Sequence, residues 1–352
     1  MADRLGRIPG LVAEADAILV SAQADVRWAT GFTGSNGLLV VLGDEAHFVT
    51  DGRYREQAAS EVSGARIHIV RGDLLTHAAE KLLSGSPTIA VQSDHLTVAR
   101  NSSLTRMLPG ARWLEVENLN RAHRERKTEE EIDLIRRAQA ITEEALQQTL
   151  KVIRPGITEL EVVAELIHAH LSRGATGMSF DPIVASGPCA ALPHARPTTR
   201  KIEAGELILI DVGCFFGGYA SDMTRMVCIG QPAQKEKEVV AHVQRALELA
   251  MESAKAGMTS RELDAIARDY LTGVGLGEAF NHSLGHGVGL EIHEWPPVSF
   301  RSGDVLPEGA VITMEPGVYL PGEFGVRIED MFVIRIGGVD RITKLSLDLI
   351  IL

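Results

Sequence analysis

Four acidic residues stand in or beside strongly apolar segments of the second half of the chain: Asp211, Asp222, Glu315 and Glu329. Ionised carboxylates are seldom buried unless they are paired, because an isolated charge is costly to take out of water. Asp211 ends the apolar run 207–210, and Glu315 ends the apolar run 311–314. Glu329 lies inside a third strand-like stretch, where glutamate is a poor fit. This pattern predicts that the four carboxylates converge on a cation.

The two aspartates fall in a predicted β-hairpin. Segment 207–229 has two apolar stretches around a Gly-Gly pair, which is typical of such a hairpin. With residues 215–218 as the loop, counting pairs Asp211 with Asp222 and places their Cβ atoms ~5 Å apart, where like charges repel. In the alternative arrangement both aspartates lie near strand ends in water, which requires no metal ion.

A glycine-rich stretch, 282–294, carries three histidines within twelve residues, namely His282, His286 and His293. A single histidine is usually a satisfied polar group, but glycine lets the backbone approach a ligand closely. Four carboxylates and the His286 imidazole suit Mn²⁺ best, with Co²⁺, Fe²⁺ and Zn²⁺ as alternatives. Five ligands exceed the needs of one tetrahedral zinc ion, so we expect two divalent ions ~3.5 Å apart.

The elements that must position these residues are of mixed type. The first third of the chain alternates strand-like and helix-like segments, which predicts a small layered α/β domain. The expected strands are 17–20, 37–42, 46–50 and 88–91, with a hairpin turn at 43–44 and helices from 51 and from 96.

A charged segment, 120–128, marks the expected boundary between domains 1–122 and 123–352. Thr128 and Glu131 have the spacing of a capping box, and apolar residues then recur at helical spacing. A long amphipathic helix therefore opens the second domain, and further helices are expected at 160–171, 239–254 and 260–271. The overall expectation is an α/β (α+β) protein of two domains.

Composition excludes several classes of function. The 352 residues are 45% hydrophobic with a net charge of -12, which fits a globular chain and argues against nucleic-acid binding. Three unpaired cysteines, Cys189, Cys214 and Cys228, predict no disulfide framework. The N-terminus lacks the pattern of a secretory leader, and no segment approaches the ~18 apolar residues that span a bilayer. We therefore expect a cytoplasmic protein without a membrane partner.

At its carboxylate and histidine motifs the chain closely resembles the M24 creatinase/aminopeptidase (pita-bread) family, and within it the Xaa-Pro peptidases. The resemblance covers the whole chain, including an N-terminal creatinase-like domain, and Met226 is a departure because many relatives have Thr there. The motifs that carry it are Asp211-Val212-Gly213, Gly218-Tyr219-Ala220-Ser221-Asp222-Met223-Thr224-Arg225, residues 282–294, Met314-Glu315-Pro316-Gly317, Arg327-Ile328-Glu329-Asp330, and the segments 28–54 and 127–140.

The resemblance implies a role for each metal ligand. Asp211 would chelate one ion, and Asp222 and Glu329 would bridge both. His286 and Glu315 would hold the other ion, and Glu315 would also take the proton from the attacking water.

The resemblance also implies roles around the substrate. His194 would bind the scissile carbonyl, and His293 would face it near the residue before the scissile bond. Arg327 would orient the bridging carboxylates. His282 and Tyr219 are expected to line the substrate pocket, with simple packing as an equal alternative.

The expected activity is hydrolysis of the Xaa-Pro bond in peptides with proline at the second position. We favour an aminopeptidase over a dipeptidase (prolidase), because a dipeptidase must bind the free substrate carboxylate, usually with an arginine. Arg196 and Arg53 are the candidates for that contact, and neither stands in a compelling motif. Relatives with this organisation are commonly homodimers, so we expect a homodimer.

Three other functions are alternatives to this one. Methionine aminopeptidases share the five ligands but lack an N-terminal domain of this size. Creatinase-type relatives lack the metal carboxylates. An inactive binding protein of the same fold would have lost a ligand, and the chain retains all five.

Overall fold

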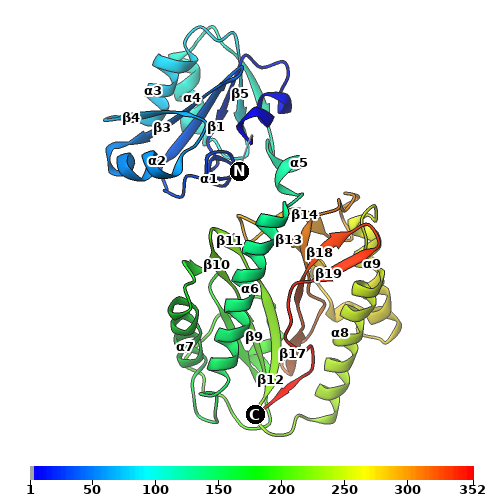
Figure 1. Ribbon diagram of the computed structural model, residues 1–352. Helices are drawn as coiled ribbons and strands as arrows, with labels where there is room; N and C mark the ends of the chain where they lie inside the picture. The colour runs from blue at the N-terminus through cyan, green and yellow to red at the C-terminus, as the bar shows by residue number, and fades with distance from the viewer. Residues whose placement is uncertain (1–3) are drawn as a thin grey trace. The chain divides into compact units, whose positions relative to one another are not determined.

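The computed structural model describes residues 4–352, and the chain divides into two compact units, residues 1–122 and 123–352 (Figure 1). Each unit has its own sheet and helices, as the α/β expectation requires. Within residues 4–352, no helix is both long and apolar enough to cross a membrane.

The first unit is built on a six-stranded mixed sheet in the order β4-β3-β2-β1-β5-β6. Strand β2 is antiparallel to both its neighbours, and the other neighbouring pairs are parallel. The strands are β1 (Ala17–Val20), β2 (Gly37–Leu42), β3 (Glu45–Asp51), β4 (Arg66–Val70), β5 (Thr88–Gln92) and β6 (Arg112–Val116).

Helices α1 (Gln23–Thr30), α2 (Arg55–Glu61), α3 (Leu74–His77), a π-helical turn (Ala78–Leu83) and α4 (Val98–Met107) connect these strands. Four strands and the turn at 43–44 lie where the sequence predicted them. The edge strands β4 and β6 were not predicted, because their charged and half-buried residues lack the apolar runs of the central strands.

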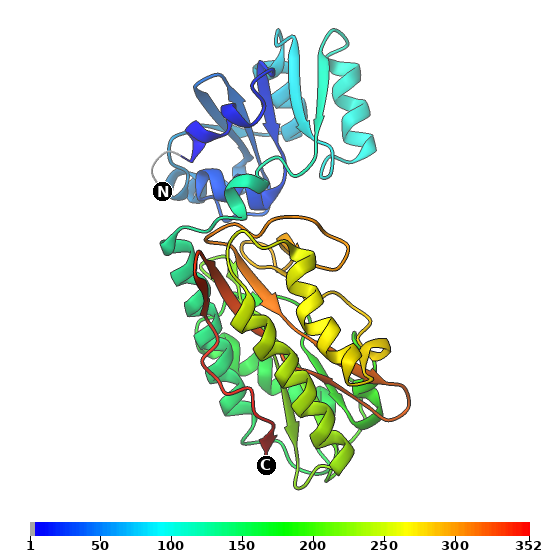
Figure 2. The same cartoon turned by 90° about the vertical axis from the view of Figure 1, so that its right-hand side faces the viewer.

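The second unit contains two helix pairs, each packed on antiparallel strands, as Figures 1 and 2 show. A short helix, α5 (Arg121–Arg124), precedes them. The pairs are α6 (Glu129–Thr149) with α7 (Glu159–Ser172), and α8 (Gln234–Ser253) with α9 (Ser260–Gly273). In Figure 2, α8 and α9 lie in front of the strands that they cover.

The helix starts follow from the sequence. At α6, α7 and α9 a threonine caps the first turn and a glutamate three residues later returns the hydrogen bond. Each box satisfies backbone N–H groups that a helix start leaves unpaired, so these starts are locally specified.

The strands of the second unit form two main sheets and two small ones. The main sheets have the orders β20-β12-β9-β8 and β14-β13-β15-β18-β19. The strands are β7 (Gly177–Met178), β8 (Ile183–Ser186), β9 (Leu207–Val212), β10 (Cys214–Phe216), β11 (Tyr219–Ala220), β12 (Met223–Cys228), β13 (Gly285–Gly287), β14 (Glu294–Val298), β15 (Val311–Met314), β16 (Gly317–Leu320), β17 (Phe324–Arg327), β18 (Asp330–Arg335), β19 (Gly338–Arg341) and β20 (Ile350–Ile351).

Strand β9 is buried on both faces and separates two hydrophobic cores. Ile208 and Ile210 pack in the core beneath α6 and α7. Leu207 and Leu209 pack in the core that also holds residues of α8 and α9. Alternate residues of a strand share a face, so Asp211 points to the same side as Leu207 and Leu209.

The hairpin register differs from the predicted one. Phe216 pairs with Tyr219, so the loop is only Gly217-Gly218, with φ of 57° and 90°. Both residues have positive φ, as a type I′ hairpin turn requires. Asp211 consequently pairs with Thr224 and not with Asp222. The error is two residues, and because side chains alternate with a period of two, both aspartates still lie on the same face.

Candidate metal centre

A cavity of about 610 Å³ lies inside the second unit. It is lined by all five predicted metal ligands, Asp211, Asp222, His286, Glu315 and Glu329. Residues separated by more than a hundred positions in the sequence therefore meet at one place, because the strands that carry them come together there.

The two aspartates come from the first main sheet. Asp211 is near the end of β9, and Asp222 lies between β11 and β12. Only 8% of the surface of Asp211 and 4% of that of Asp222 is exposed. The short Gly-Gly turn and the β9–β12 pairing place both carboxylates at the cavity.

The other three predicted ligands come from the second main sheet and its border. His286 is the central residue of β13, and Glu315 directly follows β15, the strand that pairs with β13. Glu329 lies between β17 and β18, where its N–H donates to the carbonyl of Thr224 in β12. That bridge joins the two halves of the unit at the cavity.

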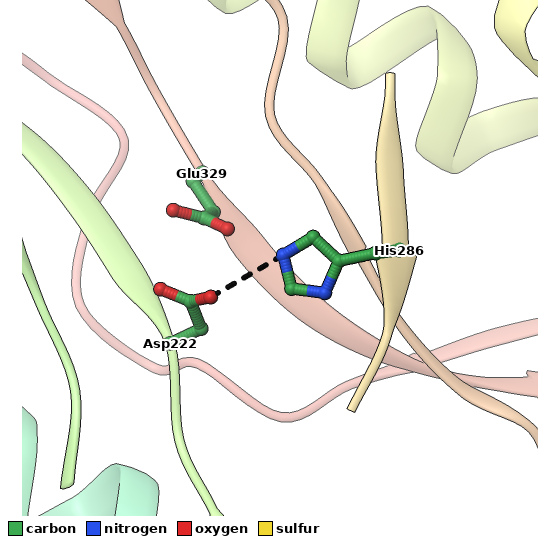
Figure 3. Close-up of side chains that lie close together, drawn as sticks. All are labelled: Asp222, His286 and Glu329. Atoms are coloured by element: carbon green, nitrogen blue, oxygen red, sulfur yellow. Dashed lines mark ion pairs between the residues drawn. The ribbon is translucent and has the colours of Figure 1, made fainter. Parts of the chain in front are cut away.

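Figure 3 shows Asp222, His286 and Glu329 directed toward one another. They offer potential ligand atoms that all lie within 4.8 Å of one another. His286 Nε2 is 3.5 Å from a carboxylate oxygen of Asp222 and 3.6 Å from one of Glu315. Spacings of this order suit several ligands of a shared ion better than direct hydrogen bonds.

Burial dominates the electrostatics of these carboxylates. It raises the pKa of Asp222 to about 6 and that of Glu315 to about 7. The pKa of Glu329 rises well above its usual range, first through burial and then through the charges of Asp222 and Glu315. Without cations the site therefore disfavours the ionised forms that would bind a metal.

For His286, burial and the neighbouring carboxylates act on the pKa in opposite directions. Burial alone would lower its pKa, but Asp222 and Glu315 raise it to about 9. The imidazolium then acts as a positive charge among the acids, in addition to Arg327. A divalent ion would supply that charge instead and would displace the protons.

The residues present fit a metal site. Asp211 Oδ1 and Asp222 Oδ1 are buried, and neither has a hydrogen-bond partner within residues 4–352. Buried polar atoms are nearly always paired, so two orphaned carboxylate oxygens in one cavity point to a missing cation. Four carboxylates and one imidazole form a donor set suited to hard or borderline divalent ions.

Arg327 lies beside this donor set. Its guanidinium contacts a carboxylate oxygen of Asp211, and its Nε donates to Thr224 Oγ1 at 3.2 Å. Thr224 in turn donates to Glu329 at 2.7 Å. The network connects Arg327 to carboxylates of both sheets, and its orienting role stays a prediction.

The predicted substrate-binding histidines also line the cavity. The rings of His286 and His293 meet edge to face with centroids 4.3 Å apart. Burial, followed by the charge of His286, lowers the pKa of His293. Burial lowers the pKa of His282 to about 4, so His282 is neutral there and bonds Tyr319 at 3.0 Å. His194 lies on the lining with an exposed side chain.

The structure does not bring Tyr219 to this cavity. Its hydroxyl donates to Glu131 at 2.6 Å, and its ring packs with Ile132 and Val288. Tyr219 is next to the hairpin turn, opposite Phe216, and this places it against α6 instead of beside the ligands. The predicted contact of Tyr219 with substrate is therefore not supported by the geometry.

Several lining residues could not be recognised in the sequence. Tyr319 stands in no chemical motif, yet its hydroxyl accepts from Arg327 at 2.7 Å inside the cavity. Phe180, Ile183 and Pro297 add an apolar wall. They also lie in segments without a chemical motif, so only the folded arrangement reveals them.

Neither candidate carboxylate-binding arginine belongs to the described lining. Arg196 is exposed and is not part of the lining, and Arg53 belongs to the first unit, where it forms two side-chain hydrogen bonds to Asp51. Arg327 is the arginine of the described lining, and it is engaged by Asp211 and Tyr319.

Comparison with known proteins agrees with this arrangement. The model of metallopeptidase family M24 matches residues 133–335, and that of the creatinase/prolidase N-terminal domain matches residues 12–126. An Xaa-Pro dipeptidase of Pyrococcus horikoshii is 37% identical over 95% of this chain and 94% of its own.

Solved structures extend the similarity to the whole fold. An Xaa-Pro dipeptidase from Bacillus anthracis has a TM-score of 0.95 at 39% identity, covering 99% of both chains. An X-Pro aminopeptidase from Thermotoga maritima has a TM-score of 0.93 at 36% identity, covering 99% of this chain and 100% of that one. With its buried carboxylate and histidine cavity and its N-terminal α/β unit, the chain belongs to metallopeptidase family M24 and has the two-domain pita-bread fold.

Proposed function

We propose that this chain is an Xaa-Pro dipeptidase that hydrolyses dipeptides with proline at the second position. The observation that carries the hydrolytic part is the cavity in which five ligand-type side chains meet and two buried carboxylate oxygens lack partners. The substrate class rests on the relatives, several of which are named Xaa-Pro dipeptidases at 35–39% identity.

We assign the five ligands to two divalent ions, with Mn²⁺ as the preferred metal. Asp211 would hold one ion, His286 and Glu315 the other, and Asp222 and Glu329 would be shared. When bound, such a pair activates water and polarises a carbonyl group. Oxygen-rich ligation favours Mn²⁺ over softer ions, although Co²⁺, Fe²⁺ and Zn²⁺ fit the same donors.

The remaining roles fall to side chains around the ligands. Glu315 would accept the proton of the attacking water, and a pKa near neutrality suits a group that takes and returns a proton. His194 and His293 would donate hydrogen bonds to the carbonyl oxygen as it gains charge. Such a site does not depend on gripping the scissile N–H, which a bond to proline lacks.

A second candidate is an Xaa-Pro aminopeptidase acting on longer peptides, the activity that the sequence favoured. One observation supports it: Arg327, the arginine of the lining, is already engaged and is not free to bind a dipeptide carboxylate. The similarity to an X-Pro aminopeptidase structure agrees with it. The dipeptidase names among the relatives outweigh these points.

Two peptides separate the candidates. Mn²⁺-loaded enzyme should hydrolyse Ala-Pro faster than Ala-Pro-Ala-Ala at matched concentration, with Ala-Ala as the control for the requirement for proline. Cleavage of the tetrapeptide with Ala-Pro left intact would replace the dipeptidase by the aminopeptidase. Failure to cleave any Xaa-Pro peptide after verified metal loading would reject both.

We also propose that the enzyme is a homodimer, as the family resemblance implies. Light scattering on the eluting protein should give twice the 38.0 kDa mass of one chain. A mass of one chain across the working concentration range would contradict this.

A further inference from the structure

Three histidines gather in the first unit, in the half of the chain that does not supply the catalytic ligands. They are His47 in β3, His68 in β4 and His77 at the end of α3. In the parallel β3–β4 pair, Val49 lies opposite His68. His47 and Val49 share a face because alternate residues do, so His47 and His68 point to the same side.

Helix α3 covers that side of the sheet. Val49 and Val70, which share the face of the two strand histidines, pack in one core with Leu74 and Leu75 of α3. His77 closes the same helix, and its ring centroid is 5.6 Å from that of His68. The fold thus brings three imidazoles from three elements to one border of the core.

The spacing of the strand histidines suits a shared ion. His47 Nδ1 is 3.1 Å from His68 Nε2, and their ring centroids are 5.3 Å apart. Two imidazoles on one tetrahedral ion, at Zn–N of ~2.0 Å, place their nitrogens ~3.3 Å and their ring centroids ~5 Å apart. The pair now shares one hydrogen bond, which a metal ion would replace.

Burial supports a ligand role. His47 is 7% exposed, and among the described residues the buried Nε2 of His77 has no hydrogen-bond partner. Burial, followed by the charges of His47 and His77, lowers the pKa of His68. Neutral imidazole is the form that binds metals.

We propose that His47, His68 and His77 form a second metal site for a borderline cation of the Zn²⁺, Ni²⁺ or Cu²⁺ type. Imidazole ligands select such ions over Mn²⁺, which prefers oxygen, so this site and the catalytic centre would differ in the metal that they retain. His77 must turn its ring to direct a nitrogen at the ion. Glu45, 3.4 Å from His47 Nε2 and largely exposed, is placed to accept from that nitrogen and so to orient the ring while Nδ1 faces the ion.

Nickel stoichiometry tests the site. Full-length enzyme is dialysed against Ni²⁺ and the bound metal is measured by elemental analysis. We expect His68→Gln and His77→Gln to bind one ion fewer per chain than the wild type. His95→Gln is the matched control, since His95 is an exposed histidine of the same unit outside the cluster, and it should bind as much as the wild type.

A double variant separates this site from the catalytic centre. Asp222→Ala should lose metal at the catalytic centre yet still lose one further Ni²⁺ when combined with His77→Gln. If His68→Gln fails to fold, His77→Gln still decides: nitrogen splittings in the Cu²⁺ electron paramagnetic resonance spectrum of Asp222→Ala should weaken when His77→Gln is added, because His286 is present in both proteins. Equal Ni²⁺ binding by wild type and cluster variants, or nitrogen splittings that do not weaken, would overturn the proposal.

Discussion

At the scale of single residues, the centre is defined by what its carboxylates lack. Asp211 and Asp222 each keep a buried oxygen unpaired, and burial raises the pKa of Asp222 and Glu315 toward neutrality. Without a cation in the cavity, these carboxyl groups tend to stay protonated. The donors are therefore better satisfied by ions than by one another.

Removing a shared ligand should remove metal and activity together. In Asp222→Ala or Glu329→Ala, each ion loses a carboxylate, so Mn²⁺ content and hydrolysis of Ala-Pro should fall in parallel. Elemental analysis of the purified variants checks this. A variant that keeps its full metal content and normal turnover would show that the altered carboxylate is not a ligand.

Substitution of His194 or His293 should affect activity but not metal content, unlike substitution of a predicted ligand. If His194 and His293 stabilise the developing oxyanion, alanine at either should reduce kcat by about 10²-fold while Mn²⁺ content stays at the wild-type level. Loss of metal from His293→Ala would make His293 a ligand instead. Tyr219→Phe is the matched control, because the Tyr219 hydroxyl donates to Glu131 and does not line the cavity, so the change should leave kcat within about twofold.

At the scale of elements, strand pairing and the two-residue alternation of side chains decide where the predicted ligands lie. Sequence counting misplaced the hairpin register by two residues, because a Gly-Gly turn can close with no further loop residues. The aspartates nonetheless share a face, since an even shift preserves side-chain direction. For Tyr219 the structure shows the packing alternative and not the pocket: it is adjacent to the turn and packs against α6.

The backbone at Gly213 lies close to the backbone at Ser221 in that hairpin, which leads to a prediction about stability. A Cβ at Gly213 would lie 1.9 Å from the carbonyl oxygen of Ser221, next to Asp222, and backbone atoms cannot yield cheaply. Gly213→Ala should therefore lower the melting temperature and the Mn²⁺ content. Gly177→Ala, in strand β7 of the same small sheet, meets nothing within 4 Å and is the control. Equal melting curves for the two variants would contradict the assigned strand pairing.

The sequence predicted much of the site and less of the surroundings. The five predicted ligands, which line one cavity, carry their own signal, because Asp, Glu and His are conspicuous among apolar strands and glycines. The capped helices were predictable too, because the Thr and Glu of a capping box are recognisable in the sequence. Tyr319 and Ile183 have ordinary residue types, and their place on the cavity depends on long-range pairing that a single sequence does not display.

At the scale of the whole molecule, metal and stability are linked. The folded-state pKa values of Asp222 and Glu315, about 6 and about 7, lie above their ordinary values of about 4, so the metal-free fold binds protons more tightly than the unfolded chain. Stability from these groups is present below about pH 4 and is lost as the pH rises to about 7. His286, raised to about 9, adds a loss between about pH 6.5 and 9.

We therefore expect the melting temperature of metal-free enzyme to fall between pH 5 and pH 8, and Mn²⁺ to restore it. Binding should release protons, measurable by calorimetric titration in buffers of different ionisation enthalpy. Glu329→Gln should melt higher than the wild type when both are metal-free at pH 8, because the raised pKa of Glu329 means that its carboxyl must hold a proton or carry a buried charge there, and glutamine does neither. A melting temperature that is unaffected by chelation would argue against a buried carboxylate centre.

The central claim is that five side chains from two sheets hold two divalent ions in one cavity. Anomalous diffraction from crystals grown with Mn²⁺ tests it most directly. The account predicts two manganese peaks ~3.5 Å apart, one beside Asp211 and one beside His286 and Glu315, with Asp222 and Glu329 between them. Peaks at other side chains, or none in this cavity at saturating Mn²⁺, would contradict it.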